Sequence, residues 1–442
     1  MSNRRSVFIL LLAFLTGTAH AQDSTAGRPA TLWTLQSCLD YAKKYNIQLN
    51  SLRLTQKTAE QNYQLSKAAR QPNLNGGVGL TYTHNGSAAV NSFQQSSFNN
   101  NFSLSSGLTI YNGGYISDDI RQKNLEIQSA NLNILETENN ITLQITQAYL
   151  AILLAKENVV YVQDLVNTTA AQVDQGKKEY EAGSIARNAY IELQANLASD
   201  KYNLITAQSS VRQNKVTLKQ LLQLPFQDSF DIVSPDTIFS KEVVAPLDTA
   251  VAIALRTRPE VMNAQLGIDI SRLDLAKAKT GYLPLLTASA AIGSAYSSSN
   301  SNDYFKQQDN SFFQQAGLNL SIPIFTKRVV KTNVENAKIE IDQSKLSLLN
   351  TQTTLALTIE QAYINVVNAQ GQYDAAVEGL KANQESFRIA TEQLRVGATN
   401  IVDYLQQKTL YTQAFQVYLQ AKYNAALSVR IYDFYMGIAV KL

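Results

Sequence analysis

The stretch Leu394-Arg395-Val396-Gly397-Ala398-Thr399-Asn400-Ile401-Val402-Asp403 joins two long runs of good helix formers that contain no proline. Gly397 can adopt the left-handed conformation that ends a helix, and Asn400 can accept backbone N–H bonds at the start of the next one. The stretch therefore predicts the tip of a very long helical hairpin. A similar tip is predicted at Glu181-Ala182-Gly183-Ser184-Ile185.

The two tips belong to an internal repeat that covers most of the chain. The segment from Leu35 to Ala42 aligns with Leu247 to Ala254, 212 positions later, and the same offset pairs Pro72 with Pro284. Further along the offset becomes 214, which pairs Gly183 with Gly397. The chain is predicted to be one structural unit written twice.

Two segments of each repeat alternate between apolar and polar residues, which is typical of half-buried strands. In the first repeat Phe102, Leu104 and Leu108 alternate with Ser103 and Gly107. The polar side is small and almost uncharged, which suits a wall facing a water-filled lumen with the apolar side toward lipid. Four strands cannot close a barrel, and open edges are not tolerated in lipid, so several chains must then supply strands together.

Aromatic residues lie near the ends of these strands. Tyr111 and Phe325 lie on one side, and Phe98 and Phe313 lie on the other. This placement is typical of an interfacial aromatic girdle. Tyrosines at the ends of a soluble sheet give the same pattern.

The expected domain organisation follows from the repeat. We expect a signal peptide at 1–21, a leader at 22–33, repeat 1 at 34–223, a crossover at 224–246 and repeat 2 at 247–438. Repeat 1 is expected to hold helices at 34–70 and 115–222, with strands at 72–83 and 101–111. Repeat 2 is expected to hold helices at 247–281 and 329–437, with strands at 284–296 and 313–325. The long helices expected at about 116–181 and 329–394, before the two tips, would each be roughly 95–100 Å long at about 1.5 Å per residue, too long for a compact domain.

The N-terminus has the features of a secretory signal. Arg4 and Arg5 supply its positive region, an apolar core runs over 7–15, and Ala19-His20-Ala21 is a small-x-small cleavage site. We expect an exported mature chain that begins near Gln22.

Composition argues against several function classes. Net charge is +3 and only 17% of residues are charged, so nothing indicates nucleic-acid binding. The chain has two histidines, one cysteine (Cys38) and no Walker A run, so no metal centre, cofactor site or catalytic triad is expected. No stretch after residue 21 is long and apolar enough for a membrane helix, which leaves the weaker signal of barrel strands open.

Taken together, the repeat, the paired strands and the hairpins resemble the TolC family of outer-membrane efflux channels. The family's opening helix, the proline before its strands and its tip motif match Leu35 to Ala42, Pro72-Asn73-Leu74 with Pro284-Leu285-Leu286, and Val396 to Asp403. The resemblance covers nearly all of the mature chain, and its specificity comes from the order of the motifs rather than from any one of them. It implies an α+β membrane protein: a homotrimer whose twelve-stranded β-barrel takes four strands from each chain and is continuous with a long α-helical barrel in the periplasm. The crossover at 224–246 would belong to an equatorial collar.

The resemblance also implies site residues at the tips. Contacts with a periplasmic adaptor protein would fall on two sets of three residues: Ala182, Gly183 and Ser184, and Val396, Gly397 and Ala398. The alternative is that both glycines simply end their helices, and both roles are compatible.

A periplasmic gate is implied at the second tip. Asp403 matches an acidic ring of the best-known members, Gln406 stands where they have a second aspartate, and Thr399 stands where they have an arginine that helps lock the closed state. These departures halve the charge and remove that lock. Three symmetry-related carboxylates would attract cations. The equal alternative is that Asn400 and Asp403 form a capping box.

The leading function is a passive exit duct in the outer membrane. An inner-membrane pump of the RND or ABC type would load it through the periplasmic adaptor. The alternative within the family is the channel of a type I protein-secretion system. A third possibility, from a different class, is a periplasmic coiled-coil structural protein without a pore, and an enzyme is disfavoured. The sequence does not identify the transported substrate.

Overall fold

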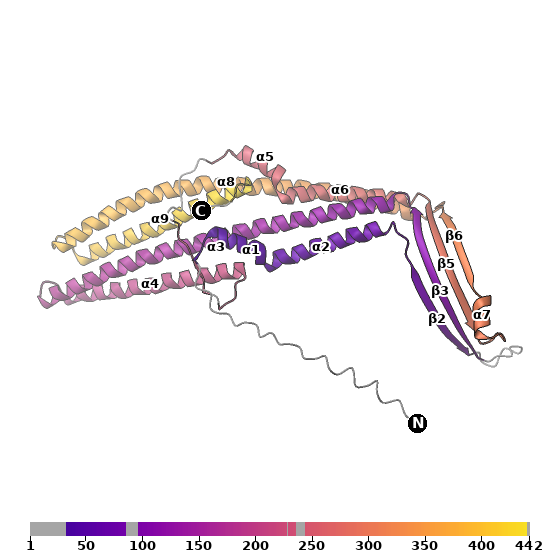
Figure 1. Ribbon diagram of the computed structural model, residues 1–442. Coiled ribbons are helices and arrows are strands. Elements are labelled where there is room, and N and C mark those ends of the chain that lie inside the picture. Colours follow the sequence, from indigo (N-terminus) through magenta and orange to yellow (C-terminus); the bar gives the residue numbers. More distant parts are fainter. Residues whose placement is uncertain (1–31, 85–95, 228, 236–243, 440–442) are drawn as a thin grey trace, which may run out of the picture.

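The protein is an elongated helical shaft with a four-stranded sheet at one end (Figure 1). Its structure, a computed structural model, describes residues 32–84, 96–227, 229–235 and 244–439. The expected signal peptide at 1–21 and most of the expected leader lie outside the described residues, as does part of the crossover.

Two helical hairpins form the shaft. α3 (Tyr115–Glu181) and α4 (Arg187–Leu222) make the first hairpin, and α8 (Val329–Arg395) and α9 (Ile401–Tyr435) make the second. The return helices are shorter than their partners, and α2 (Ile47–Ala68) and α6 (Pro259–Thr280) pack along the remaining lengths of α3 and α8. Within the described ranges, no helix combines the length and apolarity needed to cross a membrane.

A seven-residue repeat explains how α3 packs. Every seventh residue along its central part is buried: Ile134, Ile141, Ala148, Ala155, Val162, Thr169 and Gly176. The corresponding positions of α8 are mostly small, and the buried ones include Leu355, Ala362, Ala369, Ala376 and Ala390. A repeat of seven keeps one stripe of each helix facing its neighbours, as in a coiled coil.

The sheet draws two strands from each repeat. β2 (Asn75–His84), β3 (Ser96–Tyr111), β5 (Leu285–Ser297) and β6 (Phe313–Ser321) are antiparallel in the order β2-β3-β5-β6. The two repeats therefore meet in the middle of the sheet, where β3 pairs with β5. β2 and β6 form its outer edges, and the described part of the chain gives neither a second neighbour.

Two strand boundaries differ by more than three residues from the sequence-based expectation. The strand expected at 101–111 begins at Ser96, because its polar start pairs with β2 and, from Asn99 on, also with β5. The strand expected at 313–325 ends at Ser321, because Pro323 has no backbone N–H to donate. Pairing with neighbouring strands thus decides where β3 begins, in spite of its polar composition there. The missing N–H of proline decides where β6 ends.

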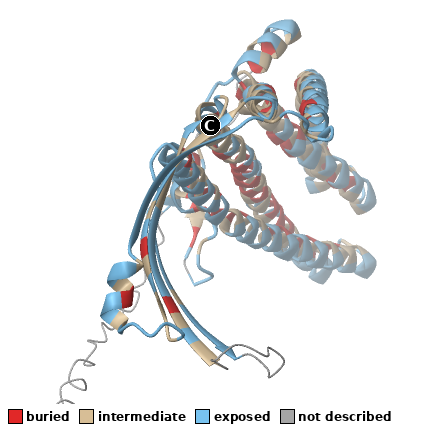
Figure 2. Cartoon of the chain, turned by 90° about the vertical axis from the view of Figure 1, so that its right-hand side faces the viewer, coloured by how far each residue is buried: buried red, intermediate tan, exposed pale blue. Residues whose placement is uncertain are grey.

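A small apolar core lies around the middle of the shaft. β1 (Leu32–Trp33) pairs in parallel with β4 (Asp231–Ile232), next to α1 (Leu35–Tyr45). Cys38 is fully buried in this core, and burial raises the pKa of its thiol to about 12. On the other side of the shaft α5 (Leu247–Thr257) packs against α8. Figure 2 shows that buried residues concentrate in the helices, whereas most of the sheet is exposed.

Candidate functional site

Both hairpin tips end their first helix in the same way. Gly183 has a φ of 76° and Gly397 a φ of 73°, in the left-handed region that glycine adopts without strain. The next residue, Ser184 or Ala398, donates its N–H to a carbonyl five positions earlier over 2.8 Å. This is the hydrogen-bond pattern of a Schellman motif. The glycines therefore act as helix ends, as one of the two sequence-based interpretations holds.

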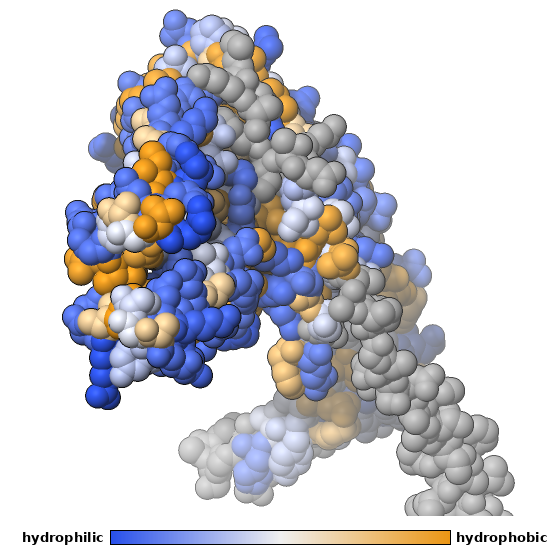
Figure 3. Space-filling view, turned by 90° about the vertical axis from the view of Figure 1, so that its left-hand side faces the viewer, coloured by the Kyte–Doolittle hydropathy of each residue, from blue (hydrophilic) through white to orange (hydrophobic). Residues whose placement is uncertain are grey.

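The same tips present an open surface. A Cβ added to Gly183 or Gly397 would meet no atom within 4 Å. All six residues expected to contact an adaptor are exposed: Ala182, Gly183, Ser184, Val396, Gly397 and Ala398. Both tips lie at the end of the shaft farthest from the sheet (Figure 1), and Figure 3 shows apolar side chains reaching the surface at that end. The fold thus brings the two sets of residues to one end of the molecule.

The three expected gate residues lie close together at the second tip. Asp403 and Gln406 are exposed on one side of the first turns of α9, while Tyr404 and Lys408 on the other side are buried. Thr399 is half-buried in the loop before the helix.

Asp403 also takes part in the helix cap. The side-chain oxygen of Asn400 accepts the N–H of Asp403 over 2.9 Å, and its amide nitrogen donates to the Asp403 carboxylate over 2.7 Å. In a capping box the carboxylate would bond the backbone N–H of the cap residue. The expected capping box is therefore wrong in this detail, because aspartate is one methylene shorter than the usual glutamate. The carboxylate still faces solvent, so a cap contact and an exposed charge coexist.

The two hairpins are joined along α3 and α9, in a set of contacts that we call the α3–α9 seam. Starting near the tips, Gln172 Nε2 donates to the Tyr404 hydroxyl. Farther along, the ring of Tyr161 stacks on Phe415 with centroids 3.7 Å apart. Nearest the middle of the shaft, Lys422 pairs with Glu157 at 2.8 Å. The seam fixes the position of one tip relative to the other.

A buried ion pair between α9 and α4 lies beside this seam. Lys408 Nζ lies 2.6 Å from an Asp200 carboxylate oxygen on α4 and 2.8 Å from Thr169 Oγ1 on α3. The side chains of Lys408 and Asp200 are 4% and 7% exposed. Burial lowers the pKa of Lys408, and the hydrogen bond and negative charge of Asp200 offset part of that effect. Three helices from both hairpins thus meet at one buried charge pair.

Sequence reasoning missed this ion pair, although the sequence carries a signal for it. Asp200 lies seven residues after Leu193 and seven before Ala207, and all three are buried on α4. A carboxylate at a coiled-coil core position requires a buried partner. Only the fold shows that the partner comes from the other repeat.

The two faces of the sheet differ in chemistry and in curvature. The register aligns even-numbered residues on one face, including Val78, Phe102, Ile292 and Leu318, while the odd-numbered face is mainly serine, asparagine, glycine and threonine. The short helix α7 (Tyr304–Asn310) contacts even-numbered Asn100 and Tyr296 and lies on the convex side of the sheet (Figure 2). The apolar face is therefore convex and the polar face concave.

The register also corrects one expectation about the aromatic residues. Phe313 was expected in an outer girdle, but it pairs with Gly293 on the odd-numbered, polar face. Its ring fills the space beside that glycine, where an added Cβ would be 2.7 Å from the ring. A packing role on the concave side explains this aromatic residue.

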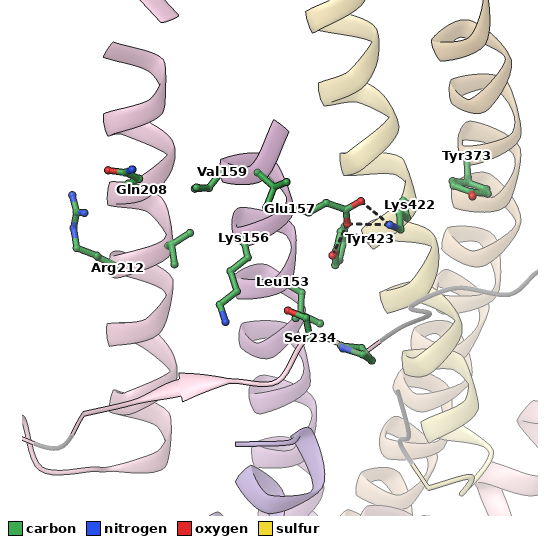
Figure 4. Close-up of a pocket in the computed structure, with 13 residues that line it drawn as sticks. Leu153, Lys156, Glu157, Val159, Gln208, Arg212, Ser234, Tyr373, Lys422 and Tyr423 are labelled. Atoms are coloured by element: carbon green, nitrogen blue, oxygen red, sulfur yellow. Dashed lines mark hydrogen bonds and ion pairs between the residues drawn. The ribbon is translucent and has the colours of Figure 1, made fainter. Parts of the chain in front are cut away.

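A cavity of about 800 Å³ opens near the middle of the shaft (Figure 4). Lys422 and Tyr423 point to Glu157, which accepts the Tyr423 hydroxyl over 2.9 Å. Burial raises the pKa of Tyr423, and the bond to Glu157 raises it further. Lys156 reaches away to Asp231 at 2.7 Å. These charged groups are paired with protein atoms and hold the helices and the crossover together.

No cluster of three or more metal-ligating side chains occurs among the residues that the structure describes.

The family model described as "Outer membrane efflux protein" matches residues 39–223 and 250–430. "Toxin and drug export protein A" of Aggregatibacter actinomycetemcomitans is 21% identical over 68% of this chain, but the chain spans only 62% of that relative's length. "Outer membrane protein TolC" of Escherichia coli K12 is 22% identical over 79% of this chain and 71% of its own length.

Solved structures of similar proteins match almost the whole fold. The chain matches CusC with a TM-score of 0.79 and 16% identity, over 95% of this chain and 96% of that one. It matches the CmeC outer membrane channel of Campylobacter jejuni with a TM-score of 0.78 and 20% identity, over 91% of this chain and 85% of that one.

Proposed function

This chain belongs to the outer membrane efflux protein family, and from that premise we propose that it is the outer-membrane exit duct of a tripartite efflux system. It conducts substrates passively and carries out no chemistry, so it needs no cofactor. An inner-membrane pump of the RND or ABC type delivers the substrates through a periplasmic adaptor protein. The signal peptide expected at 1–21 would direct the chain to export.

One observation carries the proposal: the sheet is apolar on its convex face and polar on its concave face. This is the opposite of a soluble sheet, which curls around an apolar core, and it matches a wall between lipid and an aqueous lumen. A single chain leaves the edges of β2 and β6 without neighbours in the described residues. Three chains supplying four strands each would pair those edges and close a twelve-stranded barrel, continuous with a helical barrel in the periplasm.

The tips would form the periplasmic end of the duct. Six exposed residues would contact the adaptor: Ala182, Gly183, Ser184, Val396, Gly397 and Ala398. Asp403 and Gln406 would line the entrance as neighbouring rings, about 4.5 Å apart along α9 at three residues of spacing. Thr399 would adjoin this entrance from the loop before α9.

Export of proteins through a type I secretion system is the second candidate. It is supported by the relative named for toxin and drug export. Both candidates share the duct and differ only in the pump. A coiled-coil scaffold without a pore would leave the polar concave face unexplained.

Single-channel conductance in a planar bilayer tests the duct and the gate together. Wild type is compared with Asp403→Asn, which removes the charge but keeps a side chain that Asn400 can bond. Gln406→Asp adds a carboxylate to the same exposed side of α9. We expect steady, cation-selective conductance in wild type. The cation selectivity should fall in Asp403→Asn and rise in Gln406→Asp.

The outcomes separate the parts of the proposal. Conductance with unchanged selectivity in both variants would keep the duct and leave Asp403 with its capping contact alone. A monomeric protein that dissolves without detergent and gives no conductance would refute the duct.

A further inference from the structure

The short helix α7 is held firmly against the end of the sheet. The side chain of Gln307 is buried, accepts the N–H of Ser297 over 3.0 Å and donates to the carbonyl of Asn302 over 2.6 Å. Ser311, just after the helix, accepts the N–H of Ala295 over 2.9 Å. The bonds from Ser297 and Ala295 involve the part of β5 that extends beyond its pairing with β6, which ends at Gly293. The position of α7 is therefore fixed by the sheet.

One side of α7 packs on the convex face of the sheet. Tyr304, Gln307 and Gln308 lie on this side, at the spacing of one helical face. The ring of Tyr304 packs on Tyr296 with centroids 4.9 Å apart, and Gln308 donates to Asn100 over 3.1 Å. α7 thus covers the convex face at one end.

The opposite side of α7 carries an aromatic ring beside a cation. Phe305 is 79% exposed, and the neighbouring Lys306 is also exposed and forms no ion pair with any described residue. Further exposed aromatic rings lie at this end of the sheet. Tyr82 pairs with Phe98, and this pair is next to the Leu80–Asn100 pair, whose Asn100 contacts α7. Aromatic rings with flanking lysines are typical of the boundary between acyl chains and headgroups.

We propose that α7 is a membrane-interface anchor: Phe305 inserts at the headgroup–acyl boundary of the bilayer and Lys306 contacts anionic headgroups. The occupant of this surface is the lipid bilayer, because α7 is continuous with the convex face that the proposed function places in lipid. The inference rests on that function and adds a specific lipid contact at one end of the barrel. It also explains why a charged and polar loop contains a rigid helix with an outward aromatic ring.

Spin labels at single cysteines test the depth of α7. Cys38 is fully buried, so a label reacts selectively with an introduced cysteine. Phe305→Cys is compared with Leu318→Cys, on the convex face partway along the edge strand β6, and with Glu181→Cys at the exposed tip. Each protein is reconstituted into vesicles of phosphatidylcholine and phosphatidylglycerol. Collisions with oxygen, which concentrates in the bilayer, are compared with collisions with a nickel chelate, which stays in water.

We expect the oxygen-to-nickel collision ratio to be highest at 318, severalfold lower at 181 and intermediate at 305. A ratio at 305 equal to that at 181 would show that α7 stands in water. Low collision rates with both reagents at 305 would show that a second copy of the chain covers it. Either result overturns the anchor while leaving the duct intact. A water-like ratio at 318 would instead contradict the lipid-facing sheet, and with it the proposed function.

Tryptophan fluorescence gives a second measurement that needs no labelling. The only native tryptophan, Trp33, lies in the core near the middle of the shaft. Phe305→Trp adds a ring of similar character on α7. We expect lipids brominated near the headgroup to quench the added emission more than lipids brominated near the chain end. Quenching no greater than in the parent protein would overturn the proposal.

Discussion

The two helical hairpins of this chain share their backbone and differ in the side chains that hold them. α3 and α8 both have 67 residues, and both end in the same left-handed glycine. The buried ion pair has no counterpart within either repeat: the position that matches Asp200 is Ala414, and the position that matches Lys408 is Gln194. The duplicated unit thus keeps its geometry in both copies, while its asymmetric side chains couple one copy to the other.

Removing the buried cation should give the largest effect. Lys408→Met leaves the Asp200 carboxylate buried without its partner, and we expect a loss of about 3–5 kcal/mol in the free energy of unfolding. The matched control Gln194→Met changes an exposed residue and should stay within about 0.5 kcal/mol. Urea titration of detergent-solubilised protein, followed by helical circular dichroism, measures both.

A double variant sharpens the same comparison. Lys408→Met with Asp200→Leu removes both charges, and we expect it to recover most of the loss of the single variant, because an apolar pair needs no compensation. Equal losses in Lys408→Met and Gln194→Met would show that the ion pair contributes nothing to stability.

Alkaline pH should weaken the seam through Tyr161, whose repeat counterpart is Ala375. Burial raises the pKa of Tyr161 to about 12 from an ordinary value of 10.0, and the hydrogen bond with Thr412 opposes the rise. The folded state therefore keeps the proton longer, so stability is present below pH 10 and is lost as pH rises toward 12.

We expect wild type to lose about 2–3 kcal/mol more than Tyr161→Phe across that window, since each pKa unit is worth about 1.4 kcal/mol. Lys408 acts with the opposite sign, because its lowered pKa makes stability rise with pH, but it is common to both proteins. Thr412→Val should enlarge the loss by removing the opposing bond. Parallel pH profiles for wild type and Tyr161→Phe would contradict the assignment.

The starts of the long helices offer a third contrast. Gly114 precedes α3 with a φ of 92°, and Arg328 precedes α8 in the same left-handed region with a φ of 68°. Gly114→Ala should cost about 1–2 kcal/mol, because a side chain is strained there even though no atom lies within 4 Å. Arg328→Gly should stabilise by less than about 1 kcal/mol, because relief of strain is offset by the greater entropy of unfolded glycine. Unfolding titrations showing the same sign for both changes would refute this account.

The smallest expected effect concerns the caps of the return helices. Asn400 caps α9, whereas Ala186 occupies the same position before α4 and forms no side-chain cap. Asn400→Ala should lose about 1 kcal/mol, and Ala186→Asn should gain a similar amount or less. The thermal midpoint of unfolding should move in opposite directions, and no shift for Ala186→Asn would show that the first tip cannot use a cap.

Much of this fold can be read from local chemistry. Gly183 and Gly397 mark the tips because few other residues accept a positive φ, and alternation reveals the strands because sheet side chains alternate between faces. The strand expected at 101–111 did not include Ser96–Asn100, whose composition is mostly polar, and pairing with β2, joined from Asn99 on by pairing with β5, makes this segment part of the strand. α7 was not predicted because its buried residue is a glutamine that bonds the turn before it.

The candidate site shows the same division. The exposed tips and the proximity of Asp403 to Asn400 follow from short-range spacing. The partnership of Lys408 with Asp200 spans two repeats, and no local pattern specifies which buried charge meets which. Short-range chemistry predicts single elements, whereas contacts between the copies depend on the assembled fold.

The pairing of β3 with β5 has a consequence for the order of biogenesis. Asn99 lies opposite Ser297, so the central ladder joins segments that the ribosome makes far apart in time. Until the second repeat emerges, β3 can pair only with β2, and its other edge is open to strands of other nascent chains. Closing such a long-range contact is slow. The period before β3 and β5 pair is therefore when the chain is most exposed to aggregation, and when a holding chaperone would protect it most.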